Sequence, residues 1–375
     1  MDKNPRHPGE RLRELLITRG WTQDTLATVT GRNRATISNI ISGRTGVSAD
    51  MALALAAVFG NEPQEWLRWS TEWDLARARG ASTDEVVRRA RIFEFAPIRD
   101  LKKRGWIRDT ENLSELEQDL EALFGAPLDQ GVTFPVAARK AVSLSELNVA
   151  ERAWCFRARQ LARIMPVKTF SHAKLATLEQ RLRQLAAFPK EARKLAPLLA
   201  SSGIRFVVIE PLPGARIDGA AFWLDEHSPV IAVSIRFDRI DALWFTVMHE
   251  FAHIKNGDSH SMDTDLLRDD KSEVSVVLAE DKAEKRANEE AANSLVPKVE
   301  LDSLVRRVGP LYSSTRIVQF AHKIKMHPGI IVGQLQHRGE LGYSAFREFL
   351  VKIRSIVTET ALTDGWGQSI GQGLF

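Results

Sequence analysis

Cysteine is almost absent from this chain of 375 residues, which contains a single one, Cys155. An internal disulfide is therefore impossible, and one thiol in a chain of this length fits a reducing cytoplasm. Residues 1–15 are charged and lack the apolar stretch of a secretory signal peptide. No apolar run approaches the length of a membrane span. We therefore expect a cytoplasmic protein with no membrane partner.

Internal repeats and low-complexity segments are also missing, and the excess of positive charge is small. The formal net charge is +4 and the pI is about 9.2. This balance fits a nucleic-acid partner without requiring one. Hydrophobic residues make up 44% and charged residues 27% of the chain, which is ordinary for a globular protein. The length allows two or three domains, each with its own core.

Changes in local pattern divide the chain into three predicted domains. Residues 1–80 contain short helical segments separated by glycine turns, and residues 81–200 are rich in Ala, Leu, Arg and Glu with helical periodicity. Residues 201–375 begin with β-branched and aromatic runs and return to helix. The runs predict strands over Arg205–Glu210, Ala221–Leu224 and Val230–Arg236. The predicted fold class is mainly α with a small β-sheet (α+β), in which 81–200 is a helical support region.

A helix-turn-helix pattern occupies the first domain. Thr22-Gln23 begins a helix with Leu26-Ala27 on its inner face, Gly31 provides the turn, and a second helix contains Thr36-Ile37-Ser38. The outer face of the second helix presents Arg34, Ala35, Ser38 and Asn39. Arg and Asn side chains can contact guanine and adenine edges in the major groove. The segment from Arg32 to Arg44, both included, contains three arginines and no acid.

This region resembles the Xre-type helix-turn-helix family, and more closely its HigA antitoxin branch. The resemblance extends from His7-Pro8-Gly9-Glu10, through Gly46-Val47-Ser48-Ala49-Asp50-Met51-Ala52, to Trp73-Asp74-Leu75. It implies a homodimer on a double-stranded DNA operator, usually next to the protein's own gene, and allows a toxin as a further partner. The implied base-contacting positions are Asn33, Arg34, Ala35, Ser38 and Asn39, and Arg44 is the implied phosphate contact.

A candidate metal site lies in the third domain. Asp241 is expected to cap a helix over Ala242–Asn256 that ends at Gly257, and this helix contains His249-Glu250-Phe251-Ala252-His253. Histidines four residues apart lie on one helical face, close enough to bind one Zn²⁺ together. Glu250 lies beside them and is placed to take a proton from an attacking water.

A catalytic zinc site needs a third protein ligand. A second helix is predicted from about Glu280 to Val296, and within it Glu284 is our choice of ligand. Asn288 lies one turn further and can orient a ligand by hydrogen bonding. Small side chains at Ala287, Ala291 and Ala292 allow the two helices to approach closely. Other acids of this segment could be the ligand instead, namely Asp281, Glu289 and Glu290.

The same region resembles the ImmA/IrrE family of metallopeptidases. The matching segments are Trp244–His253, Glu284-Lys285-Arg286-Ala287-Asn288 and Leu295-Val296-Pro297. The resemblance implies a thermolysin-like minimal zincin domain that cleaves a repressor or antitoxin protein. It also implies that an edge strand, about Gly219–Leu224, binds the substrate as an added strand.

Two points stay open in the sequence. His322, His327 and His337 lie in predicted C-terminal helices and a strand over Ile330–His337, and one of them could stabilise an oxyanion, although packing or surface roles are the alternative. The second concerns function: the chain could be a HigA-like antitoxin or autorepressor whose zinc domain binds a partner or senses a signal without proteolysis. The stretch Ser259–Glu273 is polar and Asp-rich and is predicted to be a surface loop.

Overall fold

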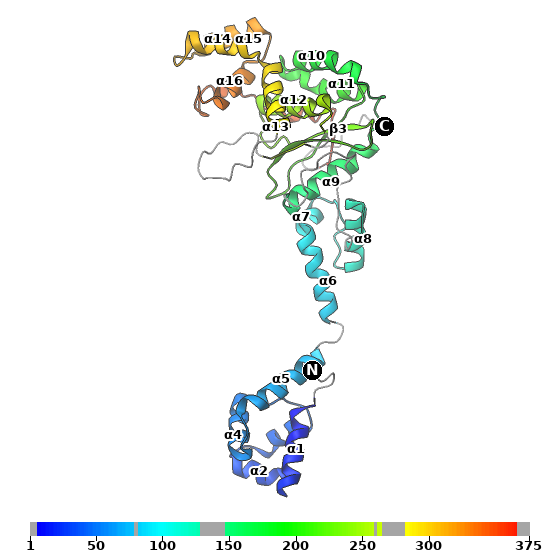
Figure 1. The fold of residues 1–375 in the computed structure, drawn as a ribbon, viewed down its shortest axis with the longest axis vertical. Coiled ribbons are helices and arrows are strands. Elements are labelled where there is room, and N and C mark those ends of the chain that lie inside the picture. The colour runs from blue at the N-terminus through cyan, green and yellow to red at the C-terminus, as the bar shows by residue number, and fades with distance from the viewer. Residues whose placement is uncertain (1–5, 79–81, 128–146, 259–260, 265–281, 366–375) are drawn as a thin grey trace. The chain divides into compact units, whose positions relative to one another are not determined.

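The computed structural model describes residues 6–78, 82–127, 147–258, 261–264 and 282–365 (Figure 1). The chain divides into two compact units, Met1–Arg91 and Ile92–Phe375. No helix among the described residues is long and apolar enough to cross a membrane. The two units are described in turn below.

The first unit is a helical bundle with its own core. Its described helices are α1 (Pro8–Arg19), α2 (Gln23–Thr30), α3 (Arg34–Ile41), α4 (Ala49–Phe59) and α5 (Pro63–Ala78), and α6 (Ser82–Phe95) crosses into the second unit. Thr22 caps α2, and Gly31 ends it with φ +64°, a conformation that favours glycine. Leu26 and Ile37 are fully buried between α2 and α3. The predicted helix-turn-helix is confirmed.

The segment before α1 explains why His7 and Gly9 occur together. His7 Nδ1 accepts a hydrogen bond of 2.9 Å from the Gly9 amide, which starts α1, and the imidazole packs edge-on against Trp73 of α5 at 4.5 Å. A side chain at Gly9 would place its Cβ 1.9 Å from the carbonyl oxygen of Ile40. Glycine is therefore required for α1 to cross α3 at this distance.

The second unit is a mixed sheet between two layers of helices. Its described strands are β1 (Arg205–Val208), β2 (Ile217–Trp223), β3 (Pro229–Val233), β4 (Ser261–Thr264) and β5 (Leu362–Thr363). Its main described helices are α7 (Ile98–Lys103), α8 (Leu113–Phe124), α9 (Val149–Ile164), α10 (Leu175–Leu185), α11 (Leu195–Ser201), α12 (Ile240–Asn256), α13 (Lys282–Leu295), α14 (Lys298–Val308), α15 (Ser314–Ile324), α16 (Pro328–His337) and α17 (Arg354–Val357).

The sheet has the strand order β4-β2-β3-β1-β5. β1 is parallel to β3 and β5, whereas β2 is antiparallel to β3 and β4. The three predicted strands are confirmed as β1, β2 and β3. Two expectations are wrong: part of the predicted surface loop forms strand β4, and β2 is not an edge strand, because β4 pairs with it from Ile217 to Ala221.

Alternation along the central strands separates two cores. Phe206, Val208 and Ile231 contribute to the core shared with α10–α16. Their neighbours Val207 and Val230 contribute to the core shared with α7, α8 and α9. Because successive side chains of a strand point to opposite faces, a sheet covered on both sides is apolar at every position. Residues 92–127 and 147–200 therefore share their cores with the sheet that follows them.

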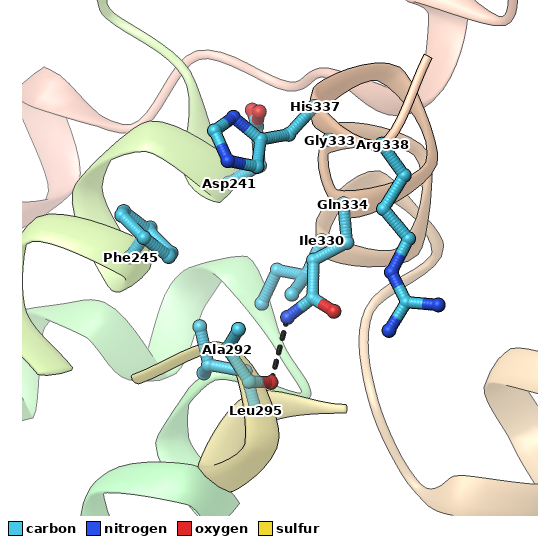
Figure 2. Close-up of a pocket in the computed structure, with 9 residues that line it drawn as sticks. All are labelled: Asp241, Phe245, Ala292, Leu295, Ile330, Gly333, Gln334, His337 and Arg338. Carbon is cyan, nitrogen blue, oxygen red and sulfur yellow. Dashed lines mark hydrogen bonds between the residues drawn. The ribbon is translucent and has the colours of Figure 1, made fainter. Parts of the chain in front are cut away.

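One further expectation, which concerns the segment that forms helix α16, is wrong. The run Ile330–His337 was expected to be a strand, but it is helical. His327 caps the helix through Nδ1, and Pro328 occupies its first turn, where its missing amide hydrogen has no cost. α12, α13 and α16 together line a pocket, which Figure 2 shows with its lining side chains labelled.

Candidate metal centre

Helix α12 contains both candidate histidines, His249 and His253. It runs over Ile240–Asn256 and ends at Gly257 with φ +67°, as the sequence predicts. The cap is different: Arg239 occupies the N-cap position without a side-chain hydrogen bond, and Asp241 lies inside the first turn. Asp241 is buried and forms a bidentate ion pair with Arg239, at 3.1 and 2.7 Å, so it stabilises the helix start by charge rather than by capping.

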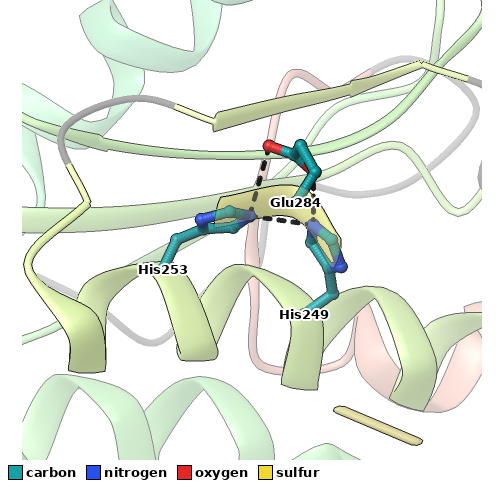
Figure 3. Close-up of side chains that lie close together, drawn as sticks. All are labelled: His249, His253 and Glu284. Carbon is teal, nitrogen blue, oxygen red and sulfur yellow. Dashed lines mark hydrogen bonds and ion pairs between the residues drawn. The ribbon is translucent and has the colours of Figure 1, made fainter. Parts of the chain in front are cut away.

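Three side chains converge above α12 (Figure 3). His249 Nε2 and His253 Nε2 are 2.9 Å apart. Glu284 reaches them from α13, with Oε2 3.2 Å from His249 Nε2 and Oε1 3.4 Å from His253 Nε2. Both histidines are fully buried, whereas the Glu284 side chain is 28% exposed. The predicted convergence of these three groups is present, and their role as zinc ligands stays a prediction.

The donor set fits a zinc ion. In a tetrahedral site with bonds of about 2.0–2.1 Å, two ligand atoms lie about 3.3 Å apart. The three separations in the cluster are 2.9, 3.2 and 3.4 Å. Two imidazoles and one carboxylate also form a familiar ligand set for catalytic zinc, which leaves a fourth position for water or substrate.

Each histidine is held by a hydrogen bond at its other nitrogen. His249 Nδ1 lies 3.1 Å from Asn288 Oδ1, as predicted, and His253 Nδ1 lies 3.1 Å from Asp258 Oδ2. A histidine that donates through Nδ1 keeps a lone pair on Nε2 for a metal. Asp258 is in turn held by Arg286 of α13, whose Nη2 donates to both carboxylate oxygens at 2.6 and 2.8 Å.

Asp258 was missed at the level of sequence. It is the first residue after the terminal Gly257, and its amide donates to the carbonyl of His253 at 2.9 Å. The glycine turns the chain back along the helix and so returns Asp258 to the histidine five residues earlier. An acid directly after the helix-ending glycine is the signal that could have found it.

Charge stabilises Glu284 in its ionised form. Burial acts to raise the pKa of this carboxyl, but its hydrogen bonds with His249 and His253 outweigh burial and lower the pKa to about 2. The ionised carboxylate is therefore the favoured form of Glu284 at this point. A deprotonated carboxylate is the form that binds a metal.

Glu250 lies under strand β2. Its side chain is fully buried, and a Cβ at Gly219 would come within 2.7 Å of Glu250 Oε1 and 2.6 Å of Thr246 Cγ2. Any other residue at 219 would collide with α12, so glycine lets the backbone of β2 pass directly over this carboxyl.

Of the alternative ligands, the two that lie among the described residues, Glu289 and Glu290, do not join the cluster. Glu290 accepts hydrogen bonds from Lys255 at 3.3 Å and Asn256 at 3.2 Å, and Glu289 is exposed. Asp281 lies outside the described residues. Among the candidate histidines, His322 is exposed and His327 caps α16, where burial lowers its pKa against the opposing effect of Asp241.

The expected DNA contacts lie around α3. Arg34, Ala35, Ser38 and Arg44 are exposed, and Asn39 is half-buried. Arg34 Nε is 3.1 Å from Asp24 of α2, and both side chains are 67% exposed, so this ion pair is weak and can open. Asn33 caps α3, with Oδ1 accepting from the Ala35 amide at 2.8 Å. Its first role is therefore to begin the helix.

Comparisons with known proteins concern the first unit. Residues 12–66 match the helix-turn-helix family model HTH_3. Antitoxin HigA-1 of Vibrio cholerae is 38% identical over 90 residues, which cover 23% of this chain and 85% of the relative. Virulence-associated protein I of Dichelobacter nodosus is 38% identical over 73 residues, which cover 19% of this chain and 68% of the relative. The solved structure of antitoxin GraA is 40% identical, covers 22% of this chain and 91% of that one, and has a TM-score of 0.22.

The first unit is thus a helix-turn-helix domain with HigA-type relatives. The chain belongs to the helix-turn-helix family through this unit. The matched segments of the curated relatives span 19–24% of the chain, so the chemistry of the second unit is argued from its own geometry.

Proposed function

We propose that this protein is a DNA-binding regulator whose second unit is a zinc-dependent endopeptidase. The observation that carries the peptidase assignment is the convergence of His249, His253 and Glu284 on one point, next to the buried Glu250. The hydrogen bonds of Asn288 and Asp258 direct an Nε2 lone pair of each histidine toward that point. Two lone pairs and a carboxylate that face each other are stabilised by a shared cation.

Each residue of the candidate centre has a separate role in the proposed reaction. When bound, zinc polarises the scissile carbonyl and lowers the pKa of water. His249, His253 and Glu284 would hold the ion, and Asn288 and Asp258 hold the two imidazoles in one orientation. Glu250 takes the proton from the attacking water and then delivers it to the departing amine nitrogen.

The substrate class comes from resemblance. The ImmA/IrrE likeness of residues 244–297 indicates a repressor or antitoxin as substrate. The first unit provides a route to such a substrate, because a relative named as an antitoxin shares 38% of its residues with it over 90 positions. Recruitment to one operator would bring the peptidase to the proteins that act there.

A metal-removal experiment tests the peptidase assignment. The full chain with zinc is incubated with the purified products of the neighbouring genes and with a synthetic peptide mixture, and products are identified by mass spectrometry. We expect cleavage with zinc, no cleavage with a chelator, and recovery when zinc is added back. Cleavage that persists at full rate with a chelator, or none with zinc bound at one equivalent, would contradict the assignment.

DNA recognition is assigned to α3 and to Arg44, which follows it. We propose that a homodimer binds an operator near its own gene, with Arg34, Ala35, Ser38 and Asn39 at the base edges and Arg44 at a phosphate. The exposure of Arg34, Ala35, Ser38 and Arg44 supports this placement. Asn33 contributes mainly by starting the helix at the correct residue.

Arg34→Ala is expected to weaken binding to the operator selectively. Loss of a bidentate base contact costs about 1–3 kcal/mol. The measurement is fluorescence anisotropy with the upstream DNA of the gene and with a scrambled duplex. Arg44→Ala is the matched comparison: it should weaken both duplexes alike and reduce the salt slope by about 1. Equal affinity of Arg34→Ala and the unchanged protein for the upstream DNA would remove Arg34 from the contact surface.

A second function is favoured by the antitoxin relatives. In this alternative the chain is a HigA-like autorepressor, and the second unit binds a toxin or a metal without cleaving protein. The Glu250→Gln variant separates the two functions, since binding to a partner would be retained while cleavage would be lost.

A further inference from the structure

An acidic side chain of α2 lies beside the first residue of α3, in the helix-turn-helix unit. Asp24 Oδ1 is 3.1 Å from Arg34 Nε, and both side chains are 67% exposed. Residues 25–49 contain no Asp or Glu, so Asp24 is the last acid before a segment whose charged residues are all arginines. A carboxylate on a surface that approaches DNA phosphates lowers affinity through like-charge repulsion. A role in base selection would offset this loss of affinity.

The fold sets the relative position of the two side chains. Thr22 caps α2, so that Asp24 is the second residue of this helix. Asn33 caps α3, so that Arg34 is its first residue. The two helices also share a core, in which Leu26 is fully buried. The backbones that carry Asp24 and Arg34 are therefore held by caps and packing, and their separation does not depend on the ion pair itself.

The contact is made through Nε, at the base of the Arg34 guanidinium. A guanidinium has five N–H donors in one plane, and four of them belong to the terminal nitrogens Nη1 and Nη2. A carboxylate that binds Nε restricts rotation of this plane and leaves Nη1 and Nη2 as a second pair of donors. In the major groove, O6 and N7 of guanine accept two hydrogen bonds from such a pair.

The ion pair is weak in the free protein and strengthens against DNA. Exposed ion pairs contribute little, because water screens them and because two long side chains must be ordered. When a base pair excludes water from one side, the effective dielectric constant falls and the same attraction becomes stronger. Exposure therefore lets Arg34 adapt before binding, and the carboxylate fixes its direction once the complex has formed.

We propose that Asp24 is a positioning residue, which holds Arg34 at Nε so that Nη1 and Nη2 bind O6 and N7 of a guanine in the operator. The inference rests on the proposed base contact of Arg34, and it adds the base that is read and the residue that makes the contact selective. Without the carboxylate, Arg34 can turn toward a phosphate, a contact that carries no sequence information. Asp24 thus lowers affinity for DNA in general and raises selectivity for guanine at one position.

The first test measures base preference directly. Randomised DNA duplexes are selected on the full chain, and bound sequences are counted for the unchanged protein, Asp24→Ala, Arg34→Ala and the double variant. We expect a guanine preference at one position, which Arg34→Ala abolishes and Asp24→Ala lowers about two- to fivefold, the range of an exposed ion pair. The double variant should match Arg34→Ala, because Asp24 acts through Arg34. Preferences at all other positions should stay the same.

The second test separates positioning from a structural role. Fluorescence anisotropy gives the Kd of each protein for the selected duplex and for a scrambled one. We expect Asp24→Ala to bind the scrambled duplex more tightly than the unchanged protein does, while the ratio of the two Kd values falls. Glu14→Ala is the matched control: it breaks a pair with Arg6 of 3.5 Å, in which both side chains are 65% exposed, and should leave the ratio unchanged.

The outcomes distinguish the role of Asp24 from the base contact itself. An unchanged ratio for Asp24→Ala, with the guanine preference still lost in Arg34→Ala, overturns the positioning role while the base contact stands. Weaker binding of Asp24→Ala to both duplexes by the same factor overturns it as well, since this is the effect of a loosened α2. A guanine preference that survives Arg34→Ala overturns the proposed base contact, and the role of Asp24 with it.

Discussion

Glu250→Gln is expected to lower the rate of peptide cleavage by about 10²–10⁴-fold while the protein keeps its zinc. The amide has nearly the shape of the carboxyl but cannot take a proton from water. The space around it tolerates this change and little else, since Glu250 is fully buried and Gly219 lies directly against it. The measurement is the single-turnover cleavage rate, with bound zinc determined by elemental analysis of the same sample.

A matched variant controls for a general loss of structure. Glu289→Gln makes the same chemical change on the exposed surface of α13, and its cleavage rate should equal that of the unchanged protein. A Glu250→Gln protein that cleaves as fast as the unchanged one would mean that another group is the base. A variant that loses zinc as well would place Glu250 among the ligands rather than beside them.

Glu284→Ala is expected to remove tight zinc binding altogether. Two histidines on one helical turn provide only two ligands, and a zinc site of this type needs a third. Because Glu284 is the acid that reaches both Nε2 atoms, its loss should raise the Kd for zinc by several orders of magnitude. Competition with a chromophoric chelator measures this value directly.

Two further substitutions are expected to affect zinc binding less than Glu284→Ala does. Asp258→Ala removes the hydrogen bond to His253 and should weaken zinc binding about 10–100-fold, the usual effect of losing a group that orients a ligand. Glu290→Ala breaks only surface contacts with Lys255 and Asn256, so it should leave the Kd for zinc unchanged. If Glu284→Ala and Glu290→Ala bind zinc equally well, the third ligand is not Glu284.

The parts of the site that the sequence predicts are those set by local geometry. His249 and His253 are four residues apart on one helix, so their shared face follows from the helical repeat alone. The register of α13 was also predictable, because Ala287 and Ala291 mark the face that packs on α12 and Glu284 precedes them on it. Both alanines are buried, as a close contact between helices requires.

The parts that were missed depend on contacts between distant segments. A strand at Ser261–Thr264 is not apparent in a polar sequence, because its hydrogen bonds with β2 carry the pairing. The β-branched residues of Ile330–Val332 favour a strand by propensity, yet packing against α12 and the cap at His327 make the segment helical. Asp258 depends on the direction that the chain takes after Gly257.

The ion pair between Asp258 and Arg286 affects how firmly α13 is held beside the metal centre. It ties the end of α12 to the beginning of α13, next to the point where His253 and Glu284 meet. A metal ion held by these two residues would act as a cross-link that closes the chain segment between them. Cross-links of this kind stabilise a fold by restricting its unfolded state. In this protein, loading with zinc would therefore determine how firmly α13 is docked as well as whether the site can react.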